Sequence, residues 1–244
     1  MKLDRMILFL NAEFFGLIAV RAQWDIMDNA EVEKRVKQYF LDACSRLNRV
    51  RFAHESAYVD ALMGRLDGVL DFGEGNGSID FTSTIVADRG PGSAESLYGA
   101  DFAIVFKSEN VDKPISKAIL SQAKNDTVDG MPKAEVIRLR EQCNKMSRFT
   151  NDYIVLEAPK IAGAVPTIRL GTPSTKTWGK TRIGLDDYFL ELVLSCKHGD
   201  RRPEFIEGVA SSKLSGLTID VNGLEYTPTP KPRKKRNNKR GNTP

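Results

Sequence analysis

The sequence is poor in histidine and cysteine. Its 244 residues include two histidines, His54 and His198, and three cysteines. An HNH-type nuclease, a structural zinc site and a Ser-His-Asp triad all need imidazole as ligand or base, so these classes of site are disfavoured. The cysteines are odd in number, lie far apart and lack C-x-x-C spacing, which indicates free thiols. Free thiols are typical of a reducing compartment, and we expect a cytoplasmic protein.

Long apolar runs are also missing. A membrane-spanning helix needs about 18 consecutive apolar residues, whereas the longest run here, Met6–Val20, is interrupted by Asn11 and Glu13. We therefore expect no membrane partner. The residues that flank this run leave a secretory signal as an alternative, but the acidic residue inside it favours a buried N-terminal segment. Residues 1–26 are assigned to a segment of unclear role.

Most of the chain has no excess of positive charge. There are 36 Lys and Arg against 32 Asp and Glu, but the last fourteen residues hold seven of the basic residues and no acid. The remainder has 29 basic against 32 acidic residues, a net charge of −3. A tail of this composition, 227–244, should be disordered and should bind nucleic-acid phosphates without reading bases; the alternative is a solubilising tail. Its candidate nucleic-acid-binding residues are Arg233, Lys234, Lys235, Arg236, Lys239 and Arg240.

Hydrophobic periodicity predicts both helices and strands in one domain, residues 27–226. Their order predicts an α/β sandwich, with a central mixed β-sheet flanked by helices. The glycine-rich segment Gly73–Gly77 predicts a tight turn. The elements expected are, in chain order, helices over 31–48 and 53–66, strands at Ile79–Ala87, Asp101–Phe106 and Ala118–Lys124, a helix over 133–148, a strand at Tyr153–Leu156, a helix over 186–196 with Asp186 as its N-cap, a short helix after Pro203 and a strand near Leu217–Val221.

Three polar residues stand at the ends of two predicted strands. Asp101 begins one strand, and Gln122 and Lys124 end the next. Gln122 and Lys124 are two positions apart and share a face of the sheet, and Asp101 joins them if the two strands are neighbours. Carboxylate and amide oxygens suit Mg²⁺, so Asp101, Gln122 and the Ala123 carbonyl are candidate ligands. A lysine beside them can activate water and stabilise charge on a phosphate, which predicts phosphodiester hydrolysis.

The segments 99–102 (Gly-Ala-Asp-Phe) and 122–124 (Gln-Ala-Lys) resemble the PD-(D/E)xK nuclease superfamily, in the variant where Gln replaces the usual acid. The likeness covers residues 50–157 and is closest to small bacterial families linked to defence. It implies a restriction-endonuclease-like fold and a Mg²⁺ cofactor, for which Mn²⁺ can substitute. It also implies catalytic roles for Asp101, Gln122 and Lys124. A glutamate from an early helix commonly joins such sites: Glu55 matches it as a catalytic residue and metal ligand, and Glu95 is a second catalytic candidate. A glutamine on the helix after these strands is matched by Gln142.

A second motif lies in the segment Ser174–Thr181, which nearly matches the P-loop pattern G-x-x-x-x-G-K-T. Serine replaces the first glycine, where the loop needs backbone freedom, so a nucleotide site is disfavoured. A basic hairpin that contacts a nucleic-acid backbone or stacks on a base is the favoured interpretation. Its candidate residues are Lys176, Trp178, Lys180 and Arg182.

Together these patterns predict a Mg²⁺-dependent endonuclease that hydrolyses phosphodiester bonds in DNA rather than RNA, in a bacterial or phage defence context. One alternative is a non-catalytic nucleic-acid-binding protein with the same fold. Another is a nuclease effector that is silent until a partner or nucleotide activates it. The resemblance is also compatible with a homodimer, since many such nucleases dimerise to cut both strands.

Overall fold

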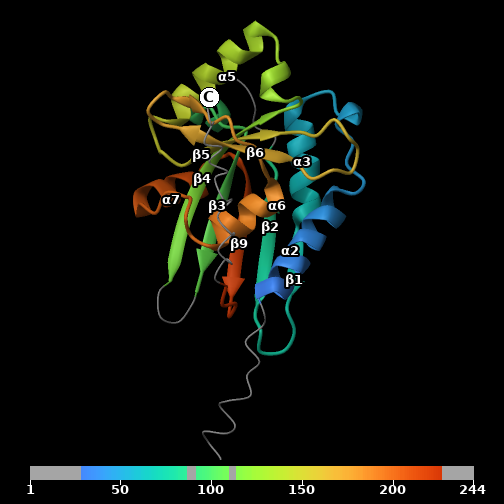
Figure 1. Ribbon diagram of the computed structural model, residues 1–244. Helices are drawn as coiled ribbons and strands as arrows, with labels where there is room; N and C mark the ends of the chain where they lie inside the picture. The colour runs from blue at the N-terminus through green and yellow to red at the C-terminus, as the bar shows by residue number, and fades with distance from the viewer. Residues whose placement is uncertain (1–28, 87–91, 110–113, 227–244) are drawn as a thin grey trace, which may run out of the picture.

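The computed structural model describes residues 29–86, 92–109 and 114–226. In this part of the chain a nine-stranded mixed sheet has the order β1-β2-β9-β3-β4-β5-β6-β7, with β8 beside β6 (Figure 1). Neighbouring strands are antiparallel except in the pairs β9–β3 and β4–β5. The predictions for residues 1–26 and 227–244 lie outside the described residues. The strands are β1 Gly68–Asp71, β2 Ser78–Thr84, β3 Phe102–Ser108, β4 Ile115–Lys124, β5 Tyr153–Glu157, β6 Thr167–Thr172, β7 Thr177–Trp178, β8 Ile183–Gly184 and β9 Ser215–Asn222.

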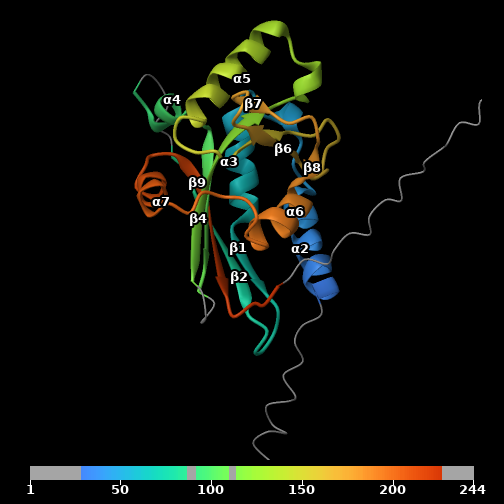
Figure 2. The ribbon, with the colours of Figure 1, turned by 60° about the vertical axis from the view of Figure 1, so that its left-hand side comes forward.

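Helices cover both faces of the sheet (Figure 2). The helices α2, α3, α6 and η3 pack on one face, and α5 and α7 pack on the other. This arrangement confirms the predicted α/β sandwich around a mixed sheet, while its restriction-endonuclease-like identity stays a prediction. The helices are α2 Asn29–Cys44, α3 Glu55–Leu66, α4 Ala94–Tyr98, α5 Lys133–Met146, α6 Leu185–Tyr188 and α7 Pro203–Ala210, with the 3-10 turns η1 Arg49–Arg51 and η2 Val128–Gly130 and the π-helix η3 Phe189–Leu194.

Two apolar cores result, one on each face of the sheet. On the first face α2 buries Val32, Val36 and Phe40, whose spacing puts them on one side of a helix. On the second face α5 buries Leu139 and Cys143 against β3, β4 and β5. These three central strands are covered on both faces, so their residues form continuous apolar runs rather than an alternating pattern. Polar residues near the end of β4 are therefore out of place in a purely structural strand.

The main elements lie where the sequence predicts them, with corrections to their bounds. The strand predicted at Ile79–Ala87 is Ser78–Thr84. The predicted helix over 31–48 ends at Cys44. The helix predicted over 186–196 begins at Leu185, and its N-cap is Gly184, so the assignment of Asp186 as N-cap is wrong. The reason is that β8 pairs with β6 directly before the helix, and Leu185 N donates to the Pro166 carbonyl at 2.9 Å. The short strands β1, β7 and β8, and the polar strand β6, were not predicted.

The three cysteines, Cys44, Cys143 and Cys196, are free thiols, as the sequence predicts. Burial raises the pKa of the Cys44 and Cys143 thiols to about 12. Both therefore stay protonated near neutral pH and are poor nucleophiles. Within the described ranges, no helix has the length and apolar character needed to cross a membrane.

Gly99 forms the corner between α4 and β3. Its φ is +72°, and a Cβ there would lie 2.7 Å from the Lys145 Cβ and 2.8 Å from the Gln142 carbonyl oxygen of α5. We expect Gly99→Ala to destabilise the protein by about 2 kcal/mol or more, because left-handed backbone strains alanine and α5 has to shift. Urea denaturation measures this change in stability.

The control is Gly64→Ala in α3, where the new methyl meets open space. This variant should gain up to about 1 kcal/mol in stability. Equal stability of Gly99→Ala and the unsubstituted protein would contradict this role.

Candidate active site

The strands β3 and β4 are antiparallel neighbours, which brings Asp101 beside Gln122. Phe102 pairs with Ser121, and the Asp101 N–H donates to the Ser121 carbonyl at 2.9 Å. The Asp101 carboxylate then lies along the end of β4, where its Oδ2 accepts hydrogen bonds from Ala123 N at 2.8 Å and from Gln122 Nε2. The convergence of Asp101 and Gln122 predicted from the two strand ends is therefore present.

Lys124 and Glu55 form the second contact of the site. Lys124 ends β4, its side chain is 4% exposed, and its Nζ donates to Glu55 Oε2 at 2.8 Å. Glu55 begins α3 and keeps 34% of its side-chain surface exposed. Its Oε1 accepts from Asn125 N at 3.4 Å, so the carboxylate caps the end of β4. Chain segments 69 residues apart thus place an acid against the lysine.

The charges of these groups act on one another. Burial raises the pKa of the Asp101 carboxyl to about 6, and the hydrogen bond from Ala123 N and the Lys124 ammonium work in the opposite direction. The Glu55 carboxylate also raises the pKa of Asp101, which means that two acids share the field of one lysine. A carboxyl perturbed by burial and beside a lysine is typical of a functional site.

The residues fit a hard divalent cation through oxygen ligands. Gln122 is 1% exposed, and its Nε2 lies against two oxygens, Asp101 Oδ2 and the Ala123 carbonyl at 3.3 Å. Its Oε1 is buried and has no hydrogen-bond partner. Rotation of this amide would turn Oε1 toward the other two oxygens and give an arrangement that Mg²⁺ prefers. In the part of the chain that the structure describes, no three His, Cys, Asp or Glu residues are grouped to hold a metal.

Two further predicted residues lie on the helices α5 and α4. Gln142 lies on α5, whose backbone packs against Gly99, and its Oε1 is buried without a hydrogen-bond partner. Glu95 lies on α4, where its carbonyl accepts from Gly99 N at 2.8 Å. The contacts that define the site run through Glu55 rather than Glu95. Of the two glutamates, Glu55 is the one that the fold brings against Lys124.

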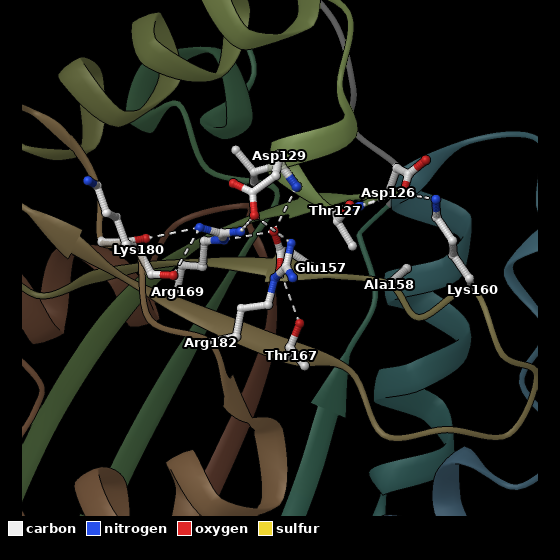
Figure 3. Close-up of polar contacts among 12 residues, drawn as sticks. Asp126, Thr127, Asp129, Glu157, Ala158, Lys160, Thr167, Arg169, Lys180 and Arg182 are labelled. Atoms are coloured by element: carbon white, nitrogen blue, oxygen red, sulfur yellow. Dashed lines mark hydrogen bonds and ion pairs between the residues drawn. The ribbon is translucent and has the colours of Figure 1, made fainter.

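A polar network that the sequence analysis missed lies on the neighbouring strands (Figure 3). Glu157 on β5 is in register with Lys124, and Arg169 on β6 pairs with Val155. Glu157 and Arg169 are 1% and 2% exposed, and Arg169 Nε donates to Glu157 Oε1 at 2.8 Å. Two features of the sequence could have indicated this network. Glu157 ends the apolar segment of β5, and Arg169 lies inside β6, which was not predicted as a strand.

The predicted basic hairpin is present, because β7 pairs with β6 through Gly171 and Trp178. Lys176 and Lys180 are exposed, whereas Trp178 is half-buried against the α5 side of the core. Arg182 lies beyond β7 and is held by ion pairs described below. A P-loop needs a helix directly after its last glycine, whereas Gly179 N bonds to the Leu170 carbonyl inside the hairpin. The tail residues Arg233, Lys234, Lys235, Arg236, Lys239 and Arg240 lie outside the described residues.

Comparison of the chain with protein-family models, with curated proteins and with solved structures found no match.

Proposed function

We propose that this protein is a metal-dependent nuclease that hydrolyses phosphodiester bonds in DNA. The observation that carries the proposal is the convergence of Asp101, Gln122 and Lys124, with Glu55 paired to the lysine at 2.8 Å. A partly buried acid, a neutral oxygen ligand and a lysine at one end of a sheet are the groups that metal-assisted hydrolysis of a phosphate ester requires. The resemblance to the PD-(D/E)xK superfamily supports the same chemistry.

Asp101, Gln122 and the Ala123 carbonyl would hold Mg²⁺ or Mn²⁺, with Glu55 as an additional acid. The ion, when bound, supplies positive charge for the phosphate and lowers the pKa of a bound water. Asp101 provides the negative charge, and its hydrogen bond from Ala123 N at 2.8 Å fixes the orientation of the carboxylate. Gln122 provides a neutral oxygen, so the site carries one negative charge fewer than a site with two acids at these positions.

Lys124 holds positive charge where a phosphate would react. Its side chain is 4% exposed, so its ammonium is poorly screened by water and acts strongly on a nearby anion. Glu55 orients it at 2.8 Å and lies at the more exposed side of the pair. When a phosphate approaches, the ammonium can interact with the phosphate oxygens, and Glu55 can accept a proton from water.

A second candidate is a nuclease that stays silent until it is activated. The near-complete burial of Gln122 and Lys124, at 1% and 4% exposure, favours it. In addition, Gln122 Nε2 lies against the two oxygens to which a cation would bind. An activator that opens this end of the sheet would let the amide rotate.

Cleavage of supercoiled plasmid by the purified full chain tests the proposal. We expect nicking with Mg²⁺ or Mn²⁺, none with EDTA, and none from Asp101→Ala in either metal. Activity that appears only when a partner or nucleotide is added would support the silent form. If the protein never cuts but retards DNA in a gel, the non-catalytic binding alternative replaces the nuclease.

A further inference from the structure

Two arginines converge on a single carboxylate oxygen beside the candidate active site (Figure 3). Asp129 Oδ2 accepts from Arg169 Nη2 at 2.7 Å and from Arg182 Nη2 at 2.9 Å. Beneath them, Glu157 accepts from both Nε atoms at 2.8 Å, with Oε1 facing Arg169 and Oε2 facing Arg182. Each guanidinium is thus held by its Nε, and the two Nη2 groups point at one position.

The base of this arrangement is rigid. Glu157 is 1% exposed, and its Oε1 also accepts from Val128 N at 2.7 Å while its Oε2 accepts from Thr167 Oγ1 at 3.1 Å. Arg169 is 2% exposed, and its Nη1 donates to the carbonyls of Gly179 and Lys180 at 3.3 Å. Groups held by several hydrogen bonds are preorganised, so they lose little entropy when an anion binds.

Asp129 differs from Glu157 and Arg169 because it is exposed. Its side chain has 67% of its surface in water and comes from the short η2 turn. The neighbouring guanidiniums lower the pKa of its carboxyl, chiefly through the hydrogen bond from Arg169. Exposed ion pairs contribute little to stability. Without Asp129 the group has two guanidiniums against one buried carboxylate, a net positive charge that reaches solvent through Arg182, which is 38% exposed.

We propose that Arg169 and Arg182 form a phosphate-binding subsite for the nucleic-acid backbone, and that Asp129 occupies it in the free protein. This deepens the proposed function, on which it rests for the nature of the substrate. Glu157 is in register with Lys124, so the subsite lies one strand away from the catalytic lysine on the same face of the sheet. A backbone phosphate replaces the Asp129 oxygen between the two Nη2 groups, because guanidinium forks suit phosphate geometry and the Asp129 side chain is 67% exposed, so water can solvate it when it is displaced.

Fluorescence anisotropy with a short labelled DNA duplex tests this subsite, with EDTA present so that binding is measured without cleavage. We expect Asp129→Asn to bind about fivefold more tightly, because the internal competitor loses its charge. Arg182→Ala should bind about fivefold more weakly and lower the slope of log K against log salt by about 1. In Asp129→Asn/Arg182→Ala the gain from the first substitution should disappear. Arg169 is left intact, since its removal would take the buried guanidinium partner at 2.8 Å away from the buried Glu157 carboxylate.

The matched control is Asp126→Asn, which removes the same charge three residues earlier on the same connection. Asp126 pairs with Arg49 and Lys160, each at 3.5 Å, and not with the two arginines of the subsite. An equal gain from Asp126→Asn would overturn the subsite in favour of general charge repulsion, and an unchanged affinity of Asp129→Asn would overturn it outright. Displacement of the duplex by an equal concentration of inorganic phosphate would overturn its assignment to a nucleic-acid strand. If the protein passes these binding tests but does not cleave DNA with Mg²⁺, the result would contradict the proposed nuclease activity and leave the phosphate-binding subsite supported.

Discussion

Replacing Asp101 with asparagine is expected to abolish metal-dependent cleavage and to make the metal-free protein more stable at pH 8. Cleavage is lost because the site loses the acid with the closest contacts to Gln122 and Ala123. Stability rises because asparagine is neutral and keeps an acceptor oxygen for the Ala123 N–H. Gain of stability with loss of function is typical of residues whose burial serves a site rather than the fold.

The direction of the pH effect follows from the pKa of Asp101, which burial raises from 3.8 to about 6. A carboxyl with a raised pKa favours the folded state while it is protonated. This contribution is present below pH 3.8 and is lost as the pH rises through about 6. The loss corresponds to up to about 3 kcal/mol above pH 6. Asparagine does not ionise, so Asp101→Asn does not lose this stability as the pH rises.

Urea unfolding in EDTA at pH 4 and pH 8 measures this effect. Asp101→Asn should exceed the unsubstituted protein in unfolding free energy at pH 8, and the difference should shrink toward zero at pH 4. Asp129→Asn is the opposite control, because its carboxyl has a lowered pKa and the substitution should bring no gain at pH 8. A destabilised Asp101→Asn at pH 8 would contradict the burial cost, and retained cleavage would remove Asp101 from the site.

Lys124→Met should lower the cleavage rate by about 10²–10³-fold while DNA binding in EDTA stays within about twofold. Methionine matches much of the length of lysine but has no charge for the reacting phosphate. The Glu55 carboxylate left behind is one-third exposed, so water can solvate it and the fold should persist. Single-turnover cleavage with saturating Mg²⁺, together with anisotropy in EDTA, separates chemistry from binding.

Lys117→Met is the matched control for this substitution. Lys117 is also on β4 and is 0% exposed, but it lies seven positions before Lys124, where its Nζ donates to the Val193 carbonyl of η3 at 2.5 Å. We expect Lys117→Met to leave the cleavage rate per folded molecule unchanged, because Lys117 contacts the carbonyls of η3 and none of the residues of the candidate site. Equal loss of cleavage in both variants would show that damage to β4, rather than the Lys124 charge, is responsible.

Local patterns were sufficient to predict the central part of the fold. The helices α3 and α5 and the strands β3, β4 and β5 follow from apolar periodicity and from runs buried on both faces. The position of β9 between β2 and β3 could not be predicted, because it depends on pairing with segments more than a hundred residues earlier in the chain. The short strands β7 and β8 carry too few residues for any periodicity to appear.

The same division applies to the site. That Gln122 and Lys124 share a face follows from the two-residue repeat of a strand, and their pairing with Asp101 needed only that β3 and β4 be neighbours. Glu55 was assigned to the site only through a family resemblance, and its ion pair with Lys124 was not predicted, since nothing local connects positions 69 residues apart. The ion pairs of Glu157 could not be predicted from the sequence, because its partners come from β6 and the segment after β7, and those partners also bind Asp129 of η2. Their meeting depends on strand register and on how the connections fold back over the sheet, and these are set by long-range packing rather than by any local pattern.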